Sequence, residues 1–175
     1  MRTISFYAEA KDKEFLLIGG HAINIYGLSR QTGNIDLVVR RDDRNWWLEL
    51  FSRLKYQVGQ NDDKFARFRS DILGVWPLNL MFVDNNTFEK LLSQATAAQI
   101  GLAQVKAVSA RHLATMKIHA LKIYQAHRHV KDYNDLLWLL RSGKTQLSLS
   151  EVEELCNRYA SSELFEKIKQ DWNNK

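Results

Sequence analysis

The sequence is poor in cysteine and proline, with one of each in 175 residues, and it contains no long hydrophobic run. The single cysteine, Cys156, excludes an internal disulfide and is typical of a reducing compartment. No apolar stretch approaches the roughly 18 residues that a membrane-spanning helix needs, and the first residues do not resemble a signal peptide. We therefore expect a cytoplasmic protein without a membrane partner.

Low-complexity linkers and internal repeats are also absent, so we expect one compact unit or one domain with a helical appendage. Hydrophobic residues make up 45% of the sequence, which is enough for a substantial core. The excess of positive charge is small, with 25 Lys and Arg against 20 Asp and Glu. This surplus permits binding to nucleotides or RNA but does not require it, since no long basic run is present.

The most informative stretch spans residues 15–40 and reads FLLIGGHAINIYGLSRQTGNIDLVVR. A short apolar run ends at Gly19-Gly20, a helical segment follows, and a second apolar run carries Asp36 near its start. Because the N-terminus of a helix presents free backbone N–H groups, this order of elements can hold a phosphate group. The carboxylate of Asp36 offers a ligand for the metal ion that accompanies such a phosphate. The predicted elements are a strand over 15–18, a helix over 21–28 and a strand over 35–39.

The next part of the chain predicts a sheet with helices around it. Pro77 cannot donate a hydrogen bond to a neighbouring strand, so it marks an edge or the beginning of a strand. The predicted elements are a helix over 45–56, an antiparallel hairpin of 64–69 with 75–83, a helix over 88–95 and a short strand over 105–108.

Residue alternation assigns faces to the two strands of the predicted hairpin. Asn79 and Met81 share one face of their strand, and the apolar Leu78, Leu80 and Phe82 take the other. On the neighbouring strand Arg67 and Arg69 share a face. Two roles are open for these arginines: contact with phosphate, or solubilising charge on an edge strand.

From residue 109 onward the pattern predicts helices only, with Ser150 and Glu153 as a capping box at the start of one of them. The predicted fold class is therefore α+β. Residues 1–108 are expected to form a small mixed β-sheet with flanking helices. Residues 109–175 are expected to form a helical bundle docked on that core.

Two motifs resemble those of a known family. The first is Gly19-Gly20 followed by a short helix and Arg30-x-Thr32-x-Asn34-x-Asp36, which resembles the R-x-T-x-D-h-D signature of minimal nucleotidyltransferases. The second is similar to the helical K-x-x-A … R … (K/R)-D-x-x-D segment of the AbiEii-type toxin branch of that superfamily. Its residues here are Lys117, Ala120, Arg128, Lys131, Asp132 and Asp135.

This resemblance implies a DNA-polymerase-β-like core that binds a nucleoside triphosphate with Mg²⁺. Such enzymes transfer a nucleoside monophosphate to a hydroxyl of RNA, for example tRNA, or of a protein, and a toxin of this branch implies a cognate antitoxin. The implied catalytic positions are Asn34, Asp36 and Asn79, with Asp36 as the metal ligand. The implied nucleotide-binding residues are Gly19, Gly20, Arg30, Thr32 and Lys117.

The sequence departs from the family pattern at two acidic positions, which are Asn34 and Asn79 here. A neutral amide oxygen is a weak ligand for a hard dication, and neither Asp71 nor Asp84 is well placed to substitute. We expect weak or absent Mg²⁺ binding and reduced or lost nucleotidyl transfer. A natural pseudoenzyme, an atypical active site and a deliberate Asp-to-Asn replacement all account for these residues. The alternative function is an inactive module that binds nucleotide, RNA or a protein partner.

Lys117 has two roles open to it. The family resemblance directs its ammonium group to the nucleotide phosphates. A buried lysine also needs a partner within the fold, and Asp132 or Asp135 can provide one. These aspartates are three residues apart on one helix face, so an ion pair with Lys117 or Arg128 is the structural expectation.

Overall fold

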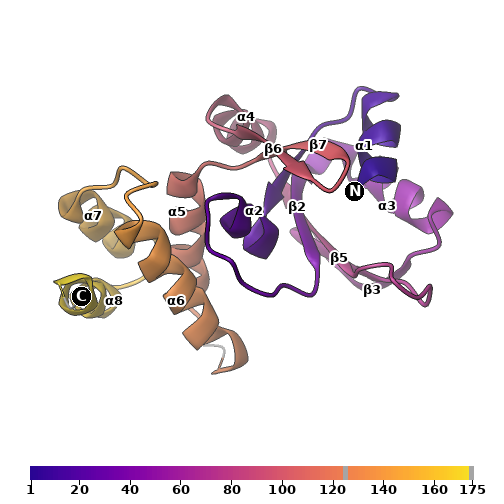
Figure 1. The fold of residues 1–175 in the computed structure, drawn as a ribbon. Helices are drawn as coiled ribbons and strands as arrows, with labels where there is room; N and C mark the ends of the chain where they lie inside the picture. Colours follow the sequence, from indigo (N-terminus) through magenta and orange to yellow (C-terminus); the bar gives the residue numbers. More distant parts are fainter. Residues whose placement is uncertain (124–125, 174–175) are drawn as a thin grey trace. The chain divides into compact units, whose positions relative to one another are not determined.

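The computed structural model describes residues 1–123 and 126–173 of the chain, which separates into two compact units, Met1–Val108 and Ser109–Lys175. Within the described residues, all strands belong to the first unit and the second is purely helical (Figure 1). The fold class is α+β, as the sequence predicts. The first unit comprises α1 (Arg2–Glu9), β1 (Phe15–Ile18), α2 (Gly19–Ile25), β2 (Ile35–Arg40), η1 (Arg41–Asp43), α3 (Arg44–Arg53), β3 (Gln57–Asn61), β4 (Phe65–Arg69), β5 (Leu78–Val83), α4 (Asn85–Ser93), β6 (Thr96–Ile100) and β7 (Ala103–Ala107).

The strands of the described residues form one mixed sheet in the order β3-β4-β5-β2-β1-β7-β6. β2 lies at its centre, antiparallel to β1 and parallel to β5. β1 is also parallel to β7, and the pairs β3–β4, β4–β5 and β6–β7 are antiparallel. The register pairs Ile18 with Asp36 and Asp36 with Asn79. The end of β1 and the beginnings of β2 and β5 therefore lie side by side.

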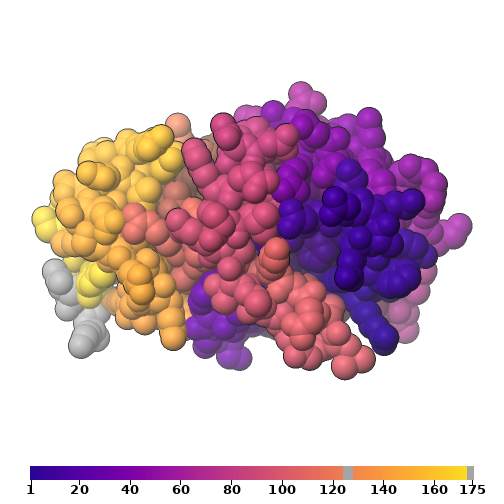
Figure 2. Space-filling view, turned by 90° about the horizontal axis from the view of Figure 1, so that it is seen from above, coloured from indigo at the N-terminus to yellow at the C-terminus, as the bar shows by residue number. Residues whose placement is uncertain are grey.

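One face of the sheet carries the core of the first unit. α1 and α3 lie together beside this face (Figure 1), and α1 also adjoins β7, with which it shares a stretch of surface (Figure 2). On α3, Trp47 and Phe51 are fully buried, and the ring of Phe51 is 5.0 Å from that of Phe68 on β4. On β5 burial alternates as predicted: Leu78, Leu80 and Phe82 are buried, whereas Asn79 and Met81 are half-buried on the other face.

Two strands were not predicted. β3 is exposed along its whole length and has no apolar alternation, and β6 is a short Ala, Thr and Gln segment with mostly exposed side chains. Both lie at the ends of the sheet, where a strand needs only one neighbour and buries little apolar surface. Strands β3 and β6 therefore form through backbone hydrogen bonds to β4 and β7, and their sequences carry no hydrophobic pattern that would predict them.

Several element boundaries also differ from the prediction by up to three residues, and two of these differences lie next to Asp36 and Asn79. β5 begins at Leu78, directly after Pro77, instead of at residue 75, because proline has no N–H to donate to the neighbouring strand. α2 begins at Gly19 and ends at Ile25, so the paired glycines form its first turn instead of preceding it. This places the glycine backbone directly against the end of β1.

The second unit consists of α5 (Ala110–Leu121), α6 (Ala126–Arg141), α7 (Leu149–Tyr159) and α8 (Ser162–Asn173). The predicted capping box of Ser150 and Glu153 is wrong by two residues: the side chain of Ser148 caps α7 and Glu151 completes the box. Ser148 ends the extended segment before α7, so it is the residue with cap geometry. Across residues 1–123 and 126–173, no helix has both the length and the apolarity that a bilayer crossing requires.

Candidate functional site

Three polar side chains meet where β2 begins. Asp36 on β2 is paired in register with Asn79 on β5, and Asn34 precedes Asp36 by two residues. The amide nitrogens of Asn34 and Asn79 both donate to Oδ1 of Asp36, the second over 2.7 Å. The structure therefore brings Asn34, Asp36 and Asn79 together at the beginnings of the central strands β2 and β5.

The charge of the carboxylate determines how the two amides are oriented. An ionised carboxylate only accepts hydrogen bonds, so each neighbouring amide turns its NH₂ group toward Asp36. Asn34 and Asn79 therefore stabilise the one negative charge of the site. Their NH₂ groups face the carboxylate, so their amide oxygens, the atoms that could bind a cation, are not the atoms turned toward Asp36.

The paired glycines lie against these side chains. Gly19 has a φ of +64°, and a Cβ at this position would overlap the carboxylate of Asp36. A Cβ on Gly20 would lie 2.6 Å from Oγ1 of Thr32 and 2.8 Å from the guanidinium of Arg30. Only glycine permits so close an approach at both positions. The backbone of the turn therefore sits within van der Waals reach of Asp36, Thr32 and Arg30.

The loop between α2 and β2 is held by a residue that the motif analysis did not single out. The side chain of Asn24, on α2, accepts a hydrogen bond from the backbone N–H of Arg30 at 3.3 Å and donates to its carbonyl at 2.9 Å. These two bonds fix the backbone of Arg30 next to the glycine turn. In the sequence Asn24 is visible only as an amide one helical turn after the glycines, and the sequence does not show which loop its side chain contacts.

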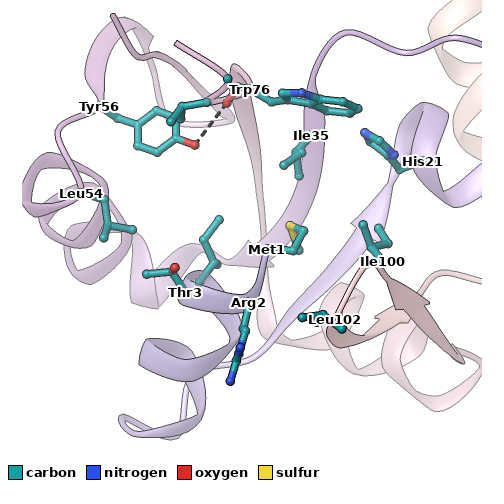
Figure 3. Close-up of a pocket in the computed structure, with 14 residues that line it drawn as sticks. Met1, Arg2, Thr3, His21, Ile35, Leu54, Tyr56, Trp76, Ile100 and Leu102 are labelled. Carbon is teal, nitrogen blue, oxygen red and sulfur yellow. Dashed lines mark hydrogen bonds between the residues drawn. The ribbon is translucent and has the colours of Figure 1, made fainter. Parts of the chain in front are cut away.

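His21 is the second residue that the motif analysis missed. It follows the glycine pair directly, and its ring stacks on Trp76 with the ring centroids 4.9 Å apart. The two rings lie along one side of an open pocket of about 590 Å³ (Figure 3). Other walls come from Ile35, which precedes Asp36, and from Tyr56, whose hydroxyl donates to the Trp76 carbonyl. This cavity is large enough for a small molecule, and it lies on the side of the sheet that carries Ile35, opposite the face that carries Asp36.

The pKa of His21 makes the stability of the fold depend on pH. Burial lowers the pKa of His21, and the attraction of Asp36 only partly opposes this shift. His21 is therefore neutral in the folded state at pH values where the unfolded chain, with a pKa of about 6.5, already binds a proton. We expect the free energy of unfolding to fall as pH falls from 7 to 5.5, and to fall less in His21→Phe, which keeps an aromatic ring. Urea denaturation at several pH values measures this, and equal pH slopes for both proteins would contradict it.

The residues at the site do not fit a two-metal centre. Two divalent cations are held by several clustered carboxylates, and the site has one, Asp36. Throughout the described part of the chain, no three His, Cys, Asp or Glu side chains come close enough together to hold a metal ion. The amides of Asn34 and Asn79 already bond to the carboxylate that would bind the cation. Weak or absent Mg²⁺ binding stays a prediction for this site.

Asp71 and Asp84 each have a different partner. Asp84 caps α4 by accepting a hydrogen bond from the backbone N–H of Thr87 at 2.8 Å. Asp71 accepts a hydrogen bond from the side chain of Gln57 at 2.6 Å. Neither aspartate bonds to the Asn34, Asp36 and Asn79 cluster, so the single-carboxylate description holds.

Lys117 lies on α5 in the second unit and is buried. Its ammonium group forms ion pairs with Asp132 at 2.5 Å and with Asp135 at 2.7 Å, both on α6. Arg128 lies 3.6 Å from the other oxygen of Asp132. Lys117 thus forms the ion pairs within the fold that are expected of a buried lysine. Its role in nucleotide binding stays a prediction.

Solved structures with the same architecture are nucleotidyltransferases or resemble them. An antigenic nucleotidyltransferase-like protein from Paracoccidioides brasiliensis superposes with a TM-score of 0.64 at 17% identity, over 98% of this chain and 86% of that one. The antibiotic-resistance factor ANT(2'')-Ia gives a TM-score of 0.61 at 15% identity, over 96% and 92%. The lincosamide antibiotic adenylyltransferase LnuA gives 0.53 at 10%, over 77% and 92%. At these identities the likeness establishes a nucleotidyltransferase fold.

The sequence itself gives the family. Residues 4–171 match the nucleotidyl transferase AbiEii toxin family of type IV toxin–antitoxin systems. The chain therefore belongs to the AbiEii nucleotidyltransferase toxin family. Curated individual proteins give no match to the chain.

Proposed function

We propose that the first unit binds a nucleoside triphosphate with its phosphates at the Gly19-Gly20 turn. We further propose that the chain with its present residues transfers nucleoside monophosphate weakly or not at all. The observation that carries this proposal is the meeting of Asn34, Asp36 and Asn79 beside Gly19. Membership of a toxin–antitoxin family supports a nucleotide substrate and a cognate antitoxin as partners. The proposed acceptor is a hydroxyl of RNA, such as tRNA, or of a protein.

The groups around the glycine turn suit phosphate oxygens. Gly20 has no side chain to keep a ligand away from the backbone, and Arg30 and Thr32 lie beside it. A guanidinium and a hydroxyl both donate hydrogen bonds, and a charged donor to a phosphate forms the stronger kind of bond. Asn24 stabilises this arrangement by fixing the backbone of Arg30.

The same site lacks the charges that nucleotidyl transfer requires. In the two-metal reaction, carboxylate-bound cations stabilise the charge on the attacking and leaving oxygens. Here one carboxylate is present, and two amides donate to it. The protein groups can therefore position a triphosphate, but they supply little of the stabilisation that accelerates its transfer.

Two measurements on the full chain test this function. Calorimetry with ATP, once with Mg²⁺ and once with EDTA, measures binding, and labelled ATP with tRNA or candidate proteins measures transfer. We expect ATP to bind in both buffers with little or no labelled product. Absence of ATP binding in both buffers would overturn the proposal.

The second candidate function is a catalytically inactive module that binds nucleotide, RNA or a protein partner. The two amide bonds to Asp36 favour it, because they satisfy the carboxylate without a metal ion. Complete absence of transfer with any acceptor, while ATP binding remains, would select this candidate. RNA or antitoxin binding without ATP binding would select a module that does not use the nucleotide.

Replacing Gly20 by alanine tests the close approach at the turn. The added Cβ would meet Thr32 and Arg30 at under 3 Å, so the loop must move away from the phosphate position. We expect loss of stability by about 1–3 kcal/mol, as for overpacked sites, and at least tenfold weaker ATP binding. Gly33→Ala is the matched control, since a Cβ at Gly33 meets nothing within 4 Å. Equal ATP affinity in the two variants would contradict the assigned phosphate position.

A further inference from the structure

A row of polar side chains leads from Asp36 across the sheet. Strand register pairs Asp36 with Asn79, Asn79 with Arg67 on β4, and Arg67 with Gln60 on β3. Directly paired residues project their side chains to the same face, about 5 Å apart. Arg67 is therefore the neighbour of Asn79 on the face of the sheet that carries Asp36.

Arg67 presents an unmatched positive charge on this face. Its side chain is exposed, and within residues 1–123 and 126–173 it forms no hydrogen bond or ion pair. Its cross-strand neighbour Asn79 occupies an acidic position of the family motif. An aspartate at 79 would lie opposite Arg67 and pair with it, whereas asparagine leaves the guanidinium charge uncompensated.

The balance of charge at the site therefore favours an anion. Asp36 contributes one negative charge and already accepts two amide hydrogen bonds, while Arg30 and Arg67 contribute two positive charges on either side of it. In a two-metal site the cations neutralise the triphosphate. Here guanidinium groups are the positive charges that the described residues place near Asp36, and guanidinium matches phosphate oxygens in geometry.

We propose that Arg67 binds the triphosphate of the nucleotide, so that ATP binds at this site without a divalent cation. This inference rests on the proposed function and deepens it, since it names the residue that takes over part of the charge neutralisation. The competing explanation is that Arg67 only solubilises an exposed strand face. Arg41 provides the comparison, because this exposed arginine follows the far end of β2, about 17 Å along the strand from Asp36.

The test is ATP binding by calorimetry to the full chain in EDTA, with inorganic tripolyphosphate as a second ligand that lacks the nucleoside. We expect Arg67→Gln to weaken binding of both ligands about tenfold, the effect of losing one charge-assisted contact. Arg41→Gln should change affinity less than about threefold, because only a screened longer-range attraction is lost. Circular dichroism and thermal unfolding confirm that both variants, which alter exposed side chains, remain folded.

Asn79→Asp supplies an independent test. The new carboxylate would pair with Arg67, so affinity for ATP in EDTA should fall, and Arg67→Gln should then cause little further loss. Equal affinity of wild type and Arg67→Gln in EDTA would overturn the role of Arg67 and leave the proposed function standing. ATP binding that requires Mg²⁺ would also overturn it. Absence of ATP binding by the wild type in every buffer would overturn the proposed function itself.

Discussion

Replacing both Asn34 and Asn79 by aspartate is expected to raise Mg²⁺-dependent nucleotidyl transfer by at least about a hundredfold, since cation stabilisation of reacting oxygens is worth several kcal/mol. The exchange is nearly isosteric, so the backbone pairing of β2 with β5 should persist. It converts two hydrogen-bond donors that face Asp36 into two carboxylates. Three clustered carboxylates are the ligand set that holds two dications against a triphosphate.

The same variant should behave differently from the wild type without any substrate. In EDTA three carboxylates repel one another, so we expect a lower melting temperature than that of the wild type. Mg²⁺ should restore it in the variant and leave the wild-type melting temperature almost unchanged, because a ligand stabilises only the protein that binds it.

Transfer is measured with labelled ATP and the same tRNA and protein acceptors in parallel. Asn86→Asp is the control for added charge away from the site, since this exposed residue lies on α4, which follows the far end of β5, and gains one of the two negative charges that the double variant adds. A double variant that binds Mg²⁺ but forms no product would show that the chain lacks more than carboxylates. Full activity of the wild type would show that the single-carboxylate site is already a working one.

The arrangement around Asp36 shows how far a sequence can predict such a site. The i, i+2 spacing of Asn34 and Asp36 and the alternation around Asn79 placed polar side chains on one face, and β2–β5 register then brought them together. Register between strands far apart in the chain is a tertiary property, so the amide bonds to Asp36 could not be predicted. Nor could the stacking of His21 on Trp76, which joins a helix to a distant loop.

In the fold, too, some elements can be predicted from the local sequence and others cannot. The buried face of β5 was predictable because hydrophobic burial imposes a period of two, whereas the exposed strands β3 and β6 carry no such period. The capping box was placed two residues late because Ser148 and Ser150 both precede a glutamate by three residues. Backbone geometry at the start of α7 decides between them, and this geometry is not written in the local sequence.

Replacing Lys117 by methionine is expected to lower the free energy of unfolding by about 3–5 kcal/mol, as for other broken buried ion pairs. The ammonium group bonds to both Asp132 and Asp135, and all three residues are buried. Removing the cation leaves two carboxylates close together without their shared partner. Chemical denaturation of the full chain measures the loss.

Lys122→Met is the matched control, because Lys122 lies at the C-terminal end of the same helix and is exposed. It should change stability by less than about 0.5 kcal/mol, as surface substitutions usually do. Adding Asp132→Asn and Asp135→Asn to Lys117→Met should recover much of the lost stability, since neutral amides no longer repel each other. No recovery would mean that lost packing of the lysine stem, and not uncompensated charge, causes the effect.

The Lys117 variants also separate the two roles open to this residue. If the ammonium group serves the fold, the recovered triple variant should bind ATP with nearly wild-type affinity. If it serves the nucleotide, the triple variant should be stable and still bind ATP at least tenfold more weakly, the loss of one charge-assisted contact. Stability and affinity measured on the same protein therefore distinguish a structural ion pair from a phosphate ligand, which Lys117→Met alone cannot do.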